Sequence, residues 1–278
     1  MQFIQATILG LIQGFTEFIP VSSSAHLLLL QRLFGWDVTS VTFDVALHMG
    51  TLVALLGFFW KDWLAIFTSF GRRVFRGVPY STTDEAAGSG RLLIPIIVAT
   101  IPAAIVGVKF DSQIESMRDR PWMIPAIAGA LAVVAVIMVA AEKISAQKRG
   151  VDKMSYVDYI VIGIAQAVAL FPGVSRSGIT IIAGLGCGLN RAAAARFSFL
   201  LSTPVILGAG AKQALDLVKT GFEPGQALII ITGFIAAAIS GYVAIRFLMN
   251  YLQRRSLNAF AWYRIALAAV ILATLFRW

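Results

Sequence analysis

The sequence predicts an all-α, polytopic membrane protein, built as an inverted-topology repeat with two re-entrant helical hairpins and about six full transmembrane helices. Composition is the first reason. Of 278 residues, 58% are hydrophobic and 13% are charged, whereas soluble domains have about 25% charged residues. A pair of similar broken segments and the number of long apolar runs are the other reasons. We expect a single integral membrane domain over residues 1–278, with repeats at about 1–141 and 154–278.

The charged residues narrow the functional classes. The net charge is +9, but basic loops in a membrane protein report topology and contact anionic lipid headgroups, so membrane lipids are expected partners and nucleic acid is not. No Lys or Arg precedes Arg32, so we expect no cleavable signal peptide. The single Cys187 excludes an intrachain disulfide.

Two stretches resemble each other 153 positions apart, residues 10–26 and 163–178. Each is an apolar run that is interrupted by proline or glycine and followed by a cluster of hydroxyl groups. The identical pairs are Gly10/Gly163, Gln13/Gln166, Phe18/Phe171, Val21/Val174, Ser22/Ser175 and Ser24/Ser177. Each interruption frees backbone N–H groups, which need a polar partner at membrane depth.

In the first half, residues 3–13 and 24–34 are too short to cross the membrane and are predicted as half-helices on either side of Pro20. A full span is expected at 43–60. The polar stretch 61–91, which contains Arg72, Arg73, Arg76 and a Ser/Thr/Gly-rich run from Ser81 to Gly90, is predicted to be a flexible, solvated loop. Further spans are expected at 92–108 and 121–141.

The second half follows the same plan, with half-helices at 156–170 and 176–189 and spans at 193–211, 226–249 and 258–276. Ala103–Gly107 also resembles Ala237–Gly241. Because each repeat has an odd number of full crossings, the second repeat enters from the opposite side of the membrane. Both helix breaks are then expected near the midplane, at the interface of the repeats.

The distribution of positive charge predicts the orientation. Loops 61–91, 142–153, 190–196 and 246–255 share one face in this arrangement and carry 14 Lys and Arg residues, against 7 on the other face. The richer face is expected to be cytoplasmic, which places both termini outside.

The two breaks have the chemistry of an anion site. Ser22, Ser23 and Ser24 suit a helix start, where free N–H groups and the helix dipole favour negative charge, and Ser175 and Ser177 repeat the arrangement. Arg176 adds a forked donor for phosphate oxygens and is costly in a membrane without a functional reason. The plainer interpretations are that the serines only cap helices and that Arg176 is a structural hydrogen-bond donor.

Glu17 and Gln13 are four residues apart and share a helix face, and Glu17 is the only carboxylate in either stretch. A bound phosphate would repel Glu17, so we expect a divalent cation, Mg²⁺ or Ca²⁺, at Glu17 and Gln13. His26 can approach Ser22 and Ser23 and serve as a base or a nucleophile, or it packs in the interior.

Serine, histidine, carboxylate and arginine together favour phosphoryl transfer. His48 is expected to be a packing residue, although Asp44 lies one turn away. The main alternative is a transporter or flippase of an anionic lipid or solute, because inverted repeats with broken helices are typical of transporters. A transporter needs binding groups but no nucleophile.

At these residues the chain resembles the undecaprenyl-diphosphate phosphatase family, the bacitracin-resistance membrane phosphatases of bacteria. The motifs are Gln13 to Glu17, the serine-rich turn Ser22 to His26, and Pro172-Gly173-Val174-Ser175-Arg176-Ser177-Gly178-Ile179-Thr180. The resemblance covers nearly the whole chain. It implies hydrolysis of undecaprenyl diphosphate, an isoprenyl diphosphate lipid, to the monophosphate. This would recycle the carrier of cell-wall synthesis in the cytoplasmic (inner) membrane, at a site open to the outer, periplasmic side.

The resemblance also implies roles for single residues and a requirement for a divalent cation. Glu17 falls on a catalytic or metal-binding acid, Arg176 on the phosphate-binding arginine, and Ser23 and His26 on the nucleophile and base. Ser23 is favoured as nucleophile, with a phosphohistidine at His26 as the alternative. The phosphate-binding residues are expected to be Ser22, Ser24, Ser175, Arg176, Ser177 and Thr180. A homodimer is left open.

Overall fold

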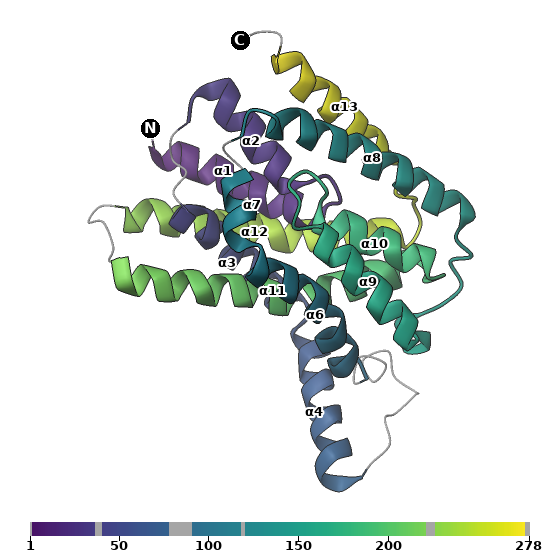
Figure 1. The fold of residues 1–278 in the computed structure, drawn as a ribbon. Coiled ribbons are helices and arrows are strands. Elements are labelled where there is room, and N and C mark those ends of the chain that lie inside the picture. Colours follow the sequence, from purple (N-terminus) through teal and green to yellow (C-terminus); the bar gives the residue numbers. More distant parts are fainter. Residues whose placement is uncertain (1, 37–40, 78–90, 118–119, 221–225, 276–278) are drawn as a thin grey trace.

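The computed structural model describes residues 2–36, 41–77, 91–117, 120–220 and 226–275. Within these ranges the chain is helical and contains no strand, apart from an isolated bridge between Arg149 and Leu189. Figure 1 shows the helices gathered in one bundle, with α4 extending from it. The all-α prediction is confirmed for the described part of the chain.

Each predicted pair of half-helices is present. The first pair is α1 (Gln2–Phe18) and α2 (Ser23–Phe34), and the second is α9 (Tyr156–Val168) and α10 (Arg176–Gly186). The interruptions fall at the predicted positions, after Phe18 and after Val168. Local residues explain why the helices are interrupted here. Pro20 lacks a backbone donor, and Gly173 has φ 91, where residues with a side chain are disfavoured.

The expected full spans are also helices, with bounds close to those predicted. They are α3 (Val41–Phe58), α6 (Leu93–Lys109), α8 (Met123–Ile144), α11 (Arg191–Thr220), α12 (Ala227–Leu252) and α13 (Asn258–Leu275). Among the described residues, α8, α11 and α12 are by themselves long and apolar enough to cross a membrane. The bent pair of α3 with the following helix α4 would be a fourth span, and α6, α9 and α13 are shorter apolar helices.

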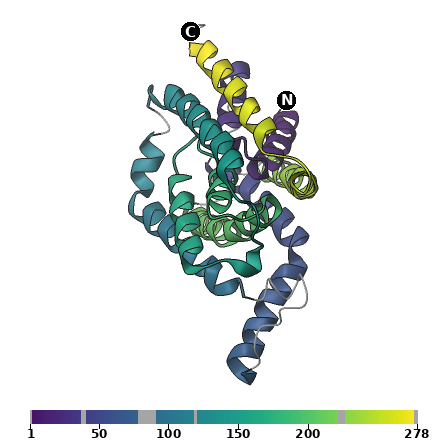
Figure 2. The same cartoon turned by 90° about the vertical axis from the view of Figure 1, so that its right-hand side faces the viewer.

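The prediction of a loop over 61–91 is wrong for its first part. Residues Trp60–Arg76 form helix α4, which bends by 69° from α3 and ends at Gly77. Figures 1 and 2 both show α4 projecting from the other helices. The apolar side chains lie along one face of this helix, and its Lys, Arg and Thr residues lie along the opposite face. A helix therefore separates the apolar from the polar side chains of this segment. The run Ser81 to Gly90 lies outside the described residues.

Two shorter helices lie in other predicted connections, α7 (Asp111–Met117) and the 3₁₀ turn Val151–Lys153. Neither changes the order of the spans.

The half-helices are packed tightly against spans of the other half. A Cβ added at Gly10 in α1 would lie 2.5 Å from the carbonyl oxygen of Gly233 in α12. A Cβ added at Gly163 in α9 would lie 2.7 Å from the carbonyl oxygen of Ala99 in α6. Backbones approach this closely only where small residues face each other. Gly10 and Gly163 are one of the pairs that match in sequence, so the same contact is made twice.

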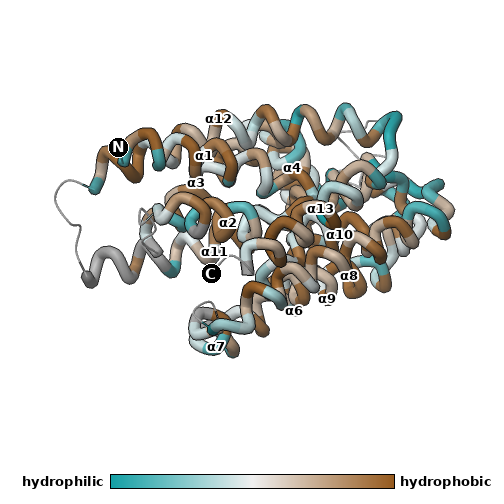
Figure 3. Tube along the Cα trace, turned by 90° about the horizontal axis from the view of Figure 1, so that it is seen from above, coloured by the Kyte–Doolittle hydropathy of each residue, from teal (hydrophilic) through white to brown (hydrophobic). Residues whose placement is uncertain are grey.

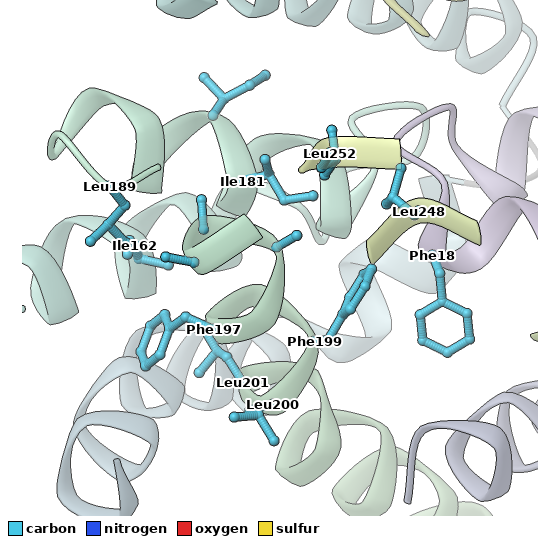
Figure 4. Close-up of a cluster of buried hydrophobic side chains, with 14 of the residues drawn as sticks. Phe18, Ile162, Ile181, Leu189, Phe197, Phe199, Leu200, Leu201, Leu248 and Leu252 are labelled. Atoms are coloured by element: carbon cyan, nitrogen blue, oxygen red, sulfur yellow. The ribbon is translucent and has the colours of Figure 1, made fainter. Parts of the chain in front are cut away.

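The largest apolar core fixes the position of the first break. Phe197, Phe199, Leu200 and Leu201 of α11 are fully buried at its centre, as Figure 4 shows. The ring of Phe18, the last residue of α1, meets the ring of Phe199 edge-on, with centroids 5.5 Å apart. Because α11 also packs on α10, this core lies beside both breaks.

Polar contacts join several helix ends on one side of the bundle. At the end of α8, Glu142 accepts hydrogen bonds from Arg191 at the start of α11 and from the Leu257 N–H between α12 and α13. Arg149 forms an ion pair with Asp158 near the start of α9. In Figure 3 hydrophilic residues collect at the end of the bundle that lies away from the N-terminus. Loop 142–153 and the connection before α11 therefore lie on the same face, as predicted.

Candidate active site at the two helix breaks

The first break has an unusual backbone. After α1 ends, the Ile19 carbonyl accepts from the Val21 N–H at 2.7 Å, and Ser22 follows with φ 77 and ψ 101. A non-glycine residue with positive φ costs about 1–3 kcal/mol and is retained where the surrounding structure requires it. The hydroxyl of Ser22 pairs with that of Ser24 at 3.1 Å. Ser22 thus precedes α2 without capping its N–H groups.

The second break repeats this backbone. Ser175 has φ 71 and ψ 112, and its hydroxyl pairs with that of Ser177 at 3.3 Å. Unlike Ser22, Ser175 also caps its helix, since its Oγ accepts from the Gly178 N–H at 3.2 Å. Two positions that match in sequence therefore share an unusual conformation and the same pairing of hydroxyls.

The two breaks meet at Glu17. Its Oε1 accepts a hydrogen bond from Arg176 Nη2 at 2.8 Å, and its Oε2 accepts from the Ser23 hydroxyl at 2.8 Å. The side chains of Glu17 and Arg176 are only 8% and 12% exposed. An ion pair this deeply buried requires further hydrogen bonds. The predicted meeting of Glu17 with Arg176 between the two helix breaks is confirmed.

Two polar atoms of this cluster have no protein partner among the described residues. Gln13 is buried, donates from Nε2 to Glu17 at 3.1 Å, and leaves its Oε1 unpaired. Arg176 leaves its Nη1 unpaired and buried. Unsatisfied buried donors and acceptors are rare and costly, and a ligand is one way to satisfy them. Arg176 Nη1 suits an anionic oxygen, and Gln13 Oε1 suits a cation or a donor.

Ser24 connects the two breaks through the backbone. Its hydroxyl accepts a hydrogen bond from the Gly173 N–H at 3.2 Å. This contact joins residues 149 positions apart in the chain and supplies a partner for an amide that the second break leaves out of a helix.

His26 lies beside the cluster but does not contact the Ser23 hydroxyl. Its Nδ1 is 2.7 Å from the carbonyl oxygen of Ser22, and its Nε2 is 2.8 Å from the hydroxyl of Tyr263. A carbonyl only accepts, so a neutral His26 carries its proton on Nδ1 and accepts from Tyr263 at Nε2. The two rings lie nearly parallel, with centroids 5.6 Å apart. In this structure the group next to the Ser23 proton is Glu17.

The predicted phosphate-binding residues after the second break have different surroundings. Thr180 is buried, and its hydroxyl contacts the Arg176 carbonyl at 2.7 Å and the Ser198 hydroxyl at 2.6 Å. Ser177 is fully buried. Both side chains lie in the first turns of α10 and contact Ser175 or the Arg176 carbonyl, so they support the start of the helix that carries Arg176. Whether any of them binds phosphate stays a prediction.

The expectation that His48 packs in the interior is wrong. Its side chain is 43% exposed, and its Nε2 lies 3.8 Å from Glu17 Oε2. Its Nδ1 is 2.8 Å from the Asp44 carbonyl oxygen, so the Nε2 of the neutral ring is free to accept. His48 is therefore a second histidine of the site. The only signal in the sequence was that His48 lies one turn after Asp44. A histidine that packs in the interior can have the same spacing, so this signal did not distinguish the two roles.

Sequence reasoning also missed Tyr263 and Arg264, which are adjacent in α13. Tyr263 contacts His26, as described above. Arg264 is fully buried and donates hydrogen bonds to carbonyl groups of both breaks. A usable signal existed, because an arginine within an apolar span is costly unless it has a function.

A cation at this site would have few protein ligands. Among the described residues, no group of three His, Cys, Asp or Glu side chains could hold a metal ion. Glu17 offers one carboxylate, Gln13 an unpaired amide oxygen and His48 an imidazole nitrogen. This set fits a divalent ion that also takes oxygen ligands from a phosphate substrate, as Mg²⁺ commonly does.

Comparison with known proteins gives a consistent result over the full length of the chain. A family model described as "Bacitracin resistance protein BacA" matches residues 6–270. The undecaprenyl-diphosphatase of Rubrobacter xylanophilus is 44% identical over 277 residues, which cover 99% of each chain. That of Thermodesulfovibrio yellowstonii is 46% identical over 97% of this chain and 96% of its own. That of Geotalea daltonii is 43% identical over 98% of both.

Proposed function

The chain belongs to the bacitracin resistance protein BacA family, and on that premise we propose that it hydrolyses undecaprenyl diphosphate to undecaprenyl phosphate and inorganic phosphate. The observation that carries the proposal is the cluster of Glu17, Ser23 and Arg176 where the two helix breaks meet. It combines a hydroxyl, a proton acceptor and a phosphate-binding group at one point. Relatives that match this chain over nearly its full length bear the name of this enzyme.

In the first step, Ser23 Oγ attacks the terminal phosphorus of the diphosphate. The Oγ–P bond forms while the bond from phosphorus to the bridging oxygen breaks, and the electron pair leaves with undecaprenyl phosphate. Glu17 accepts the hydroxyl proton, since Ser23 already donates to it at 2.8 Å. Glu17 then passes this proton to the leaving phosphate and becomes a carboxylate again. Arg176 stabilises the charge on the transferred group, which supplies most of the catalysis in phosphoryl transfer.

In the second step, water cleaves the phosphoserine. Glu17 takes a proton from the water as its oxygen attacks phosphorus, and the bond between phosphorus and Ser23 Oγ breaks. The proton returns to Ser23, and inorganic phosphate leaves. Glu17 ends the second step as the carboxylate that pairs with Arg176 in the structure, and it can serve as base in the next turnover.

The alternative nucleophile is His26, through a phosphohistidine. The contacts favour Ser23, because His26 Nε2 is directed at Tyr263 and its Nδ1 at the Ser22 carbonyl. We assign His26 to positioning the turn that carries Ser22 and Ser23. Its hydrogen bond to the Ser22 carbonyl supports a residue that would otherwise leave its unusual conformation.

We propose that a divalent cation, Mg²⁺ or Ca²⁺, binds with the substrate. Glu17 and Gln13 would hold it through their oxygen atoms, with His48 as a further donor. When bound, the ion would neutralise phosphate charge that the Glu17 carboxylate otherwise repels. The chain's own part is to keep Gln13 Oε1 unpaired and buried beside that carboxylate.

The chain is a multi-pass membrane protein, as its apolar helices and its family indicate. We propose that it lies in the bacterial cytoplasmic membrane with its site open to the outer side. Hydrolysis there would recycle the lipid carrier of cell-wall synthesis and would confer resistance to bacitracin, as the family description indicates. The alternative hypothesis of a transporter is not favoured, because relatives that match over the full length are named as an enzyme, undecaprenyl-diphosphatase.

The proposal is tested by measuring phosphate release from undecaprenyl diphosphate with purified protein, with and without EDTA. Wild type should release phosphate, and EDTA should abolish release until Mg²⁺ or Ca²⁺ is added back. Ser23→Ala and Arg176→Ala should each lower kcat by about 10³-fold or more. Ser116→Ala, at an exposed serine of α7, is the matched control and should be unaffected. If the wild-type protein moves lipid across the membrane of liposomes without releasing phosphate, the proposal that it is a phosphatase is wrong.

The nucleophile is identified by trapping the phosphoenzyme with substrate labelled at the terminal phosphorus. A serine ester survives acid, whereas a phosphohistidine is lost in acid. We expect acid-stable label in wild type and in His26→Ala, and none in Ser23→Ala. Acid-labile label that disappears in His26→Ala would transfer the role to His26.

A further inference from the structure

Arg264 is the most deeply buried charge in the described part of the chain, and the proposed reaction does not use it. It lies in the middle of α13 with no exposed surface. No carboxylate of the described residues lies within ion-pair distance of its guanidinium. Such a residue is expensive in a membrane protein and requires a specific reason. Because it is fully buried, that reason cannot be contact with the substrate.

The partners of Arg264 are all backbone carbonyl oxygens. Nη1 donates to Pro20 at 3.3 Å, and Nη2 donates to Gly173 at 3.0 Å and Val174 at 3.1 Å. Nε donates to Leu131 of α8 at 3.2 Å, and Nη2 also approaches Ala130 at 3.5 Å. Pro20 lies in the first break, and Gly173 and Val174 lie in the second. One side chain therefore contacts both breaks and the helix behind them.

The contacts fall on matching positions. Pro20 and Gly173 are separated by 153 residues, the same offset that relates Ser22 to Ser175. Each lies two residues before the serine with positive φ. An interrupted helix leaves carbonyl groups without partners, and at membrane depth each of these costs several kcal/mol. Arg264 supplies donors to the equivalent carbonyl of each break from a single planar group.

We propose that Arg264 is a positioning residue, which fixes the two helix breaks relative to each other and thereby sets the distance between Glu17 and Arg176. Two other contacts join the breaks, the ion pair of Glu17 with Arg176 and the hydrogen bond from the Gly173 N–H to Ser24. Both involve side chains that are expected to bind the phosphate groups, whereas the contacts of Arg264 are all with backbone carbonyl oxygens.

The planar fork of arginine is required, since lysine offers one compact charge that cannot donate to carbonyl groups lying in several directions. Displacing catalytic groups by about 1 Å can lower the rate about 10²-fold. We therefore expect Arg264→Met to lower kcat about 10²-fold and Arg264→Lys about 10-fold, with KM changed by less than about threefold.

The control is Arg191→Met, which removes another arginine that bridges helices. Arg191 pairs with Glu142, and the hydrogen bonds of these two side chains go to residues outside both breaks. It should lower the thermal midpoint without lowering kcat more than about threefold. If Arg191→Met loses as much kcat as Arg264→Met for the same loss of thermal stability, Arg264 is only structural and the proposal is wrong.

Hydrogen exchange tests the positioning without reference to activity. In Arg264→Met, backbone amides of residues 15–27 and 168–180 should exchange faster together, whereas Arg191→Met should leave both unchanged. Faster exchange in only one break, or in neither, would overturn the proposal. If Arg264→Met does not fold, the same kinetic and exchange measurements on Arg264→Lys test the proposal. A lysine variant with wild-type kcat and exchange would show that charge suffices and that the fork is not needed.

The kinetic part of this test rests on the proposed phosphatase activity, and the exchange part does not. If wild type releases no phosphate, the proposed function fails, while the exchange of the two breaks still decides the role of Arg264.

Discussion

Glu17 receives hydrogen bonds from three segments of the chain. Arg176 reaches it from the second break, Ser23 from the start of α2, and Gln13 from one turn earlier in α1. The oxygen that accepts from Ser23 is the one that would take its proton in the proposed reaction. The packing of the two helix breaks and the proposed proton transfer therefore both depend on the side chain of Glu17.

Replacing Glu17 by Gln should separate these roles. The amide keeps the size of the side chain but cannot accept the Ser23 proton, so kcat should fall by about 10²–10⁴-fold. Phosphate release under saturating substrate measures this. Glu142→Gln, at another carboxylate whose side chain is buried and pairs with arginine, should lower thermal stability and keep kcat. A Glu17→Gln enzyme with near wild-type kcat would remove Glu17 as the base.

Cys187 offers a pH-dependent test outside the membrane-spanning segments. Burial, together with the nearby Asp158 carboxylate, raises the pKa of its thiol to about 11. The thiolate is the reactive form. Alkylation by iodoacetamide should therefore be slow at neutral pH and keep rising through the ordinary thiol range, by about tenfold per pH unit. A rate that levels off near pH 9 would mean an ordinary thiol.

At the scale of elements, close contacts between small residues decide how the hairpins sit on the spans. Gly14 of α1 faces α12 so closely that an added Cβ would lie 2.0 Å from Ser240 Oγ and 2.5 Å from the Ala237 carbonyl oxygen. The hydroxyl of Ser240 also approaches the Gly10 carbonyl oxygen at 3.4 Å. Lipid is as apolar as a protein core, so such packing supplies much of the attraction between membrane helices.

Gly14→Ala should therefore destabilise the protein by about 1–3 kcal/mol, although alanine favours an isolated helix. The thermal midpoint in detergent measures the change. Gly57→Ala, in α3, is the matched control, because an added Cβ there meets nothing within 4 Å. It should be neutral or slightly stabilising. Equal effects of the two substitutions would contradict the close contact of α1 with α12.

Helix α4 shows how an element can be hidden in a polar stretch. Its Lys and Arg residues led to the prediction of a loop, yet Trp60, Leu64, Phe67 and Phe75 are spaced along one side and are exposed. The helical period of the apolar residues was present in the sequence. The number of charges concealed it.

At the scale of the whole molecule, we propose that the chain consists of two inverted repeats, about 1–141 and 154–278. Three pairs of equivalent features support this. Ser22 and Ser175 share positive φ, Gly10 and Gly163 make corresponding close contacts, and Pro20 and Gly173 share the donor Arg264. Such repeats place a binding site between the two halves.

The proposed orientation can be tested with single cysteines in a Cys187→Ser background. Lys148 lies in the basic loop expected in the cytoplasm, and Gln113 lies in α7 on the opposite face. Both are exposed. A membrane-impermeant maleimide added to intact cells whose outer membrane is permeable should label Gln113→Cys and spare Lys148→Cys. The opposite labelling would invert the topology and contradict the charge rule on which it rests.

The sequence alone determined the half-helices, the spans and the expected pairing of Glu17 with Arg176, but not helix α4. Helix breaks follow from Pro20, Gly173 and the serines beside them, and the spans follow from the length of apolar runs, because these signals act between neighbours in the chain. The expected partners Glu17 and Arg176 followed from the repeat, since two inverted breaks must meet at the midplane.

Only the tertiary structure decided which atoms face each other. His26 turns to Tyr263 rather than to Ser23, and His48 approaches Glu17 although it was expected in the interior. Arg264 is the clearest case, because with Arg176 it is one of the two basic residues that the charge count assigned to neither face of the membrane. The role proposed for Arg264 depends on carbonyl groups that lie 90 or more positions away in the chain. Such contacts are fixed by how helices pack, and no periodicity along the chain records them.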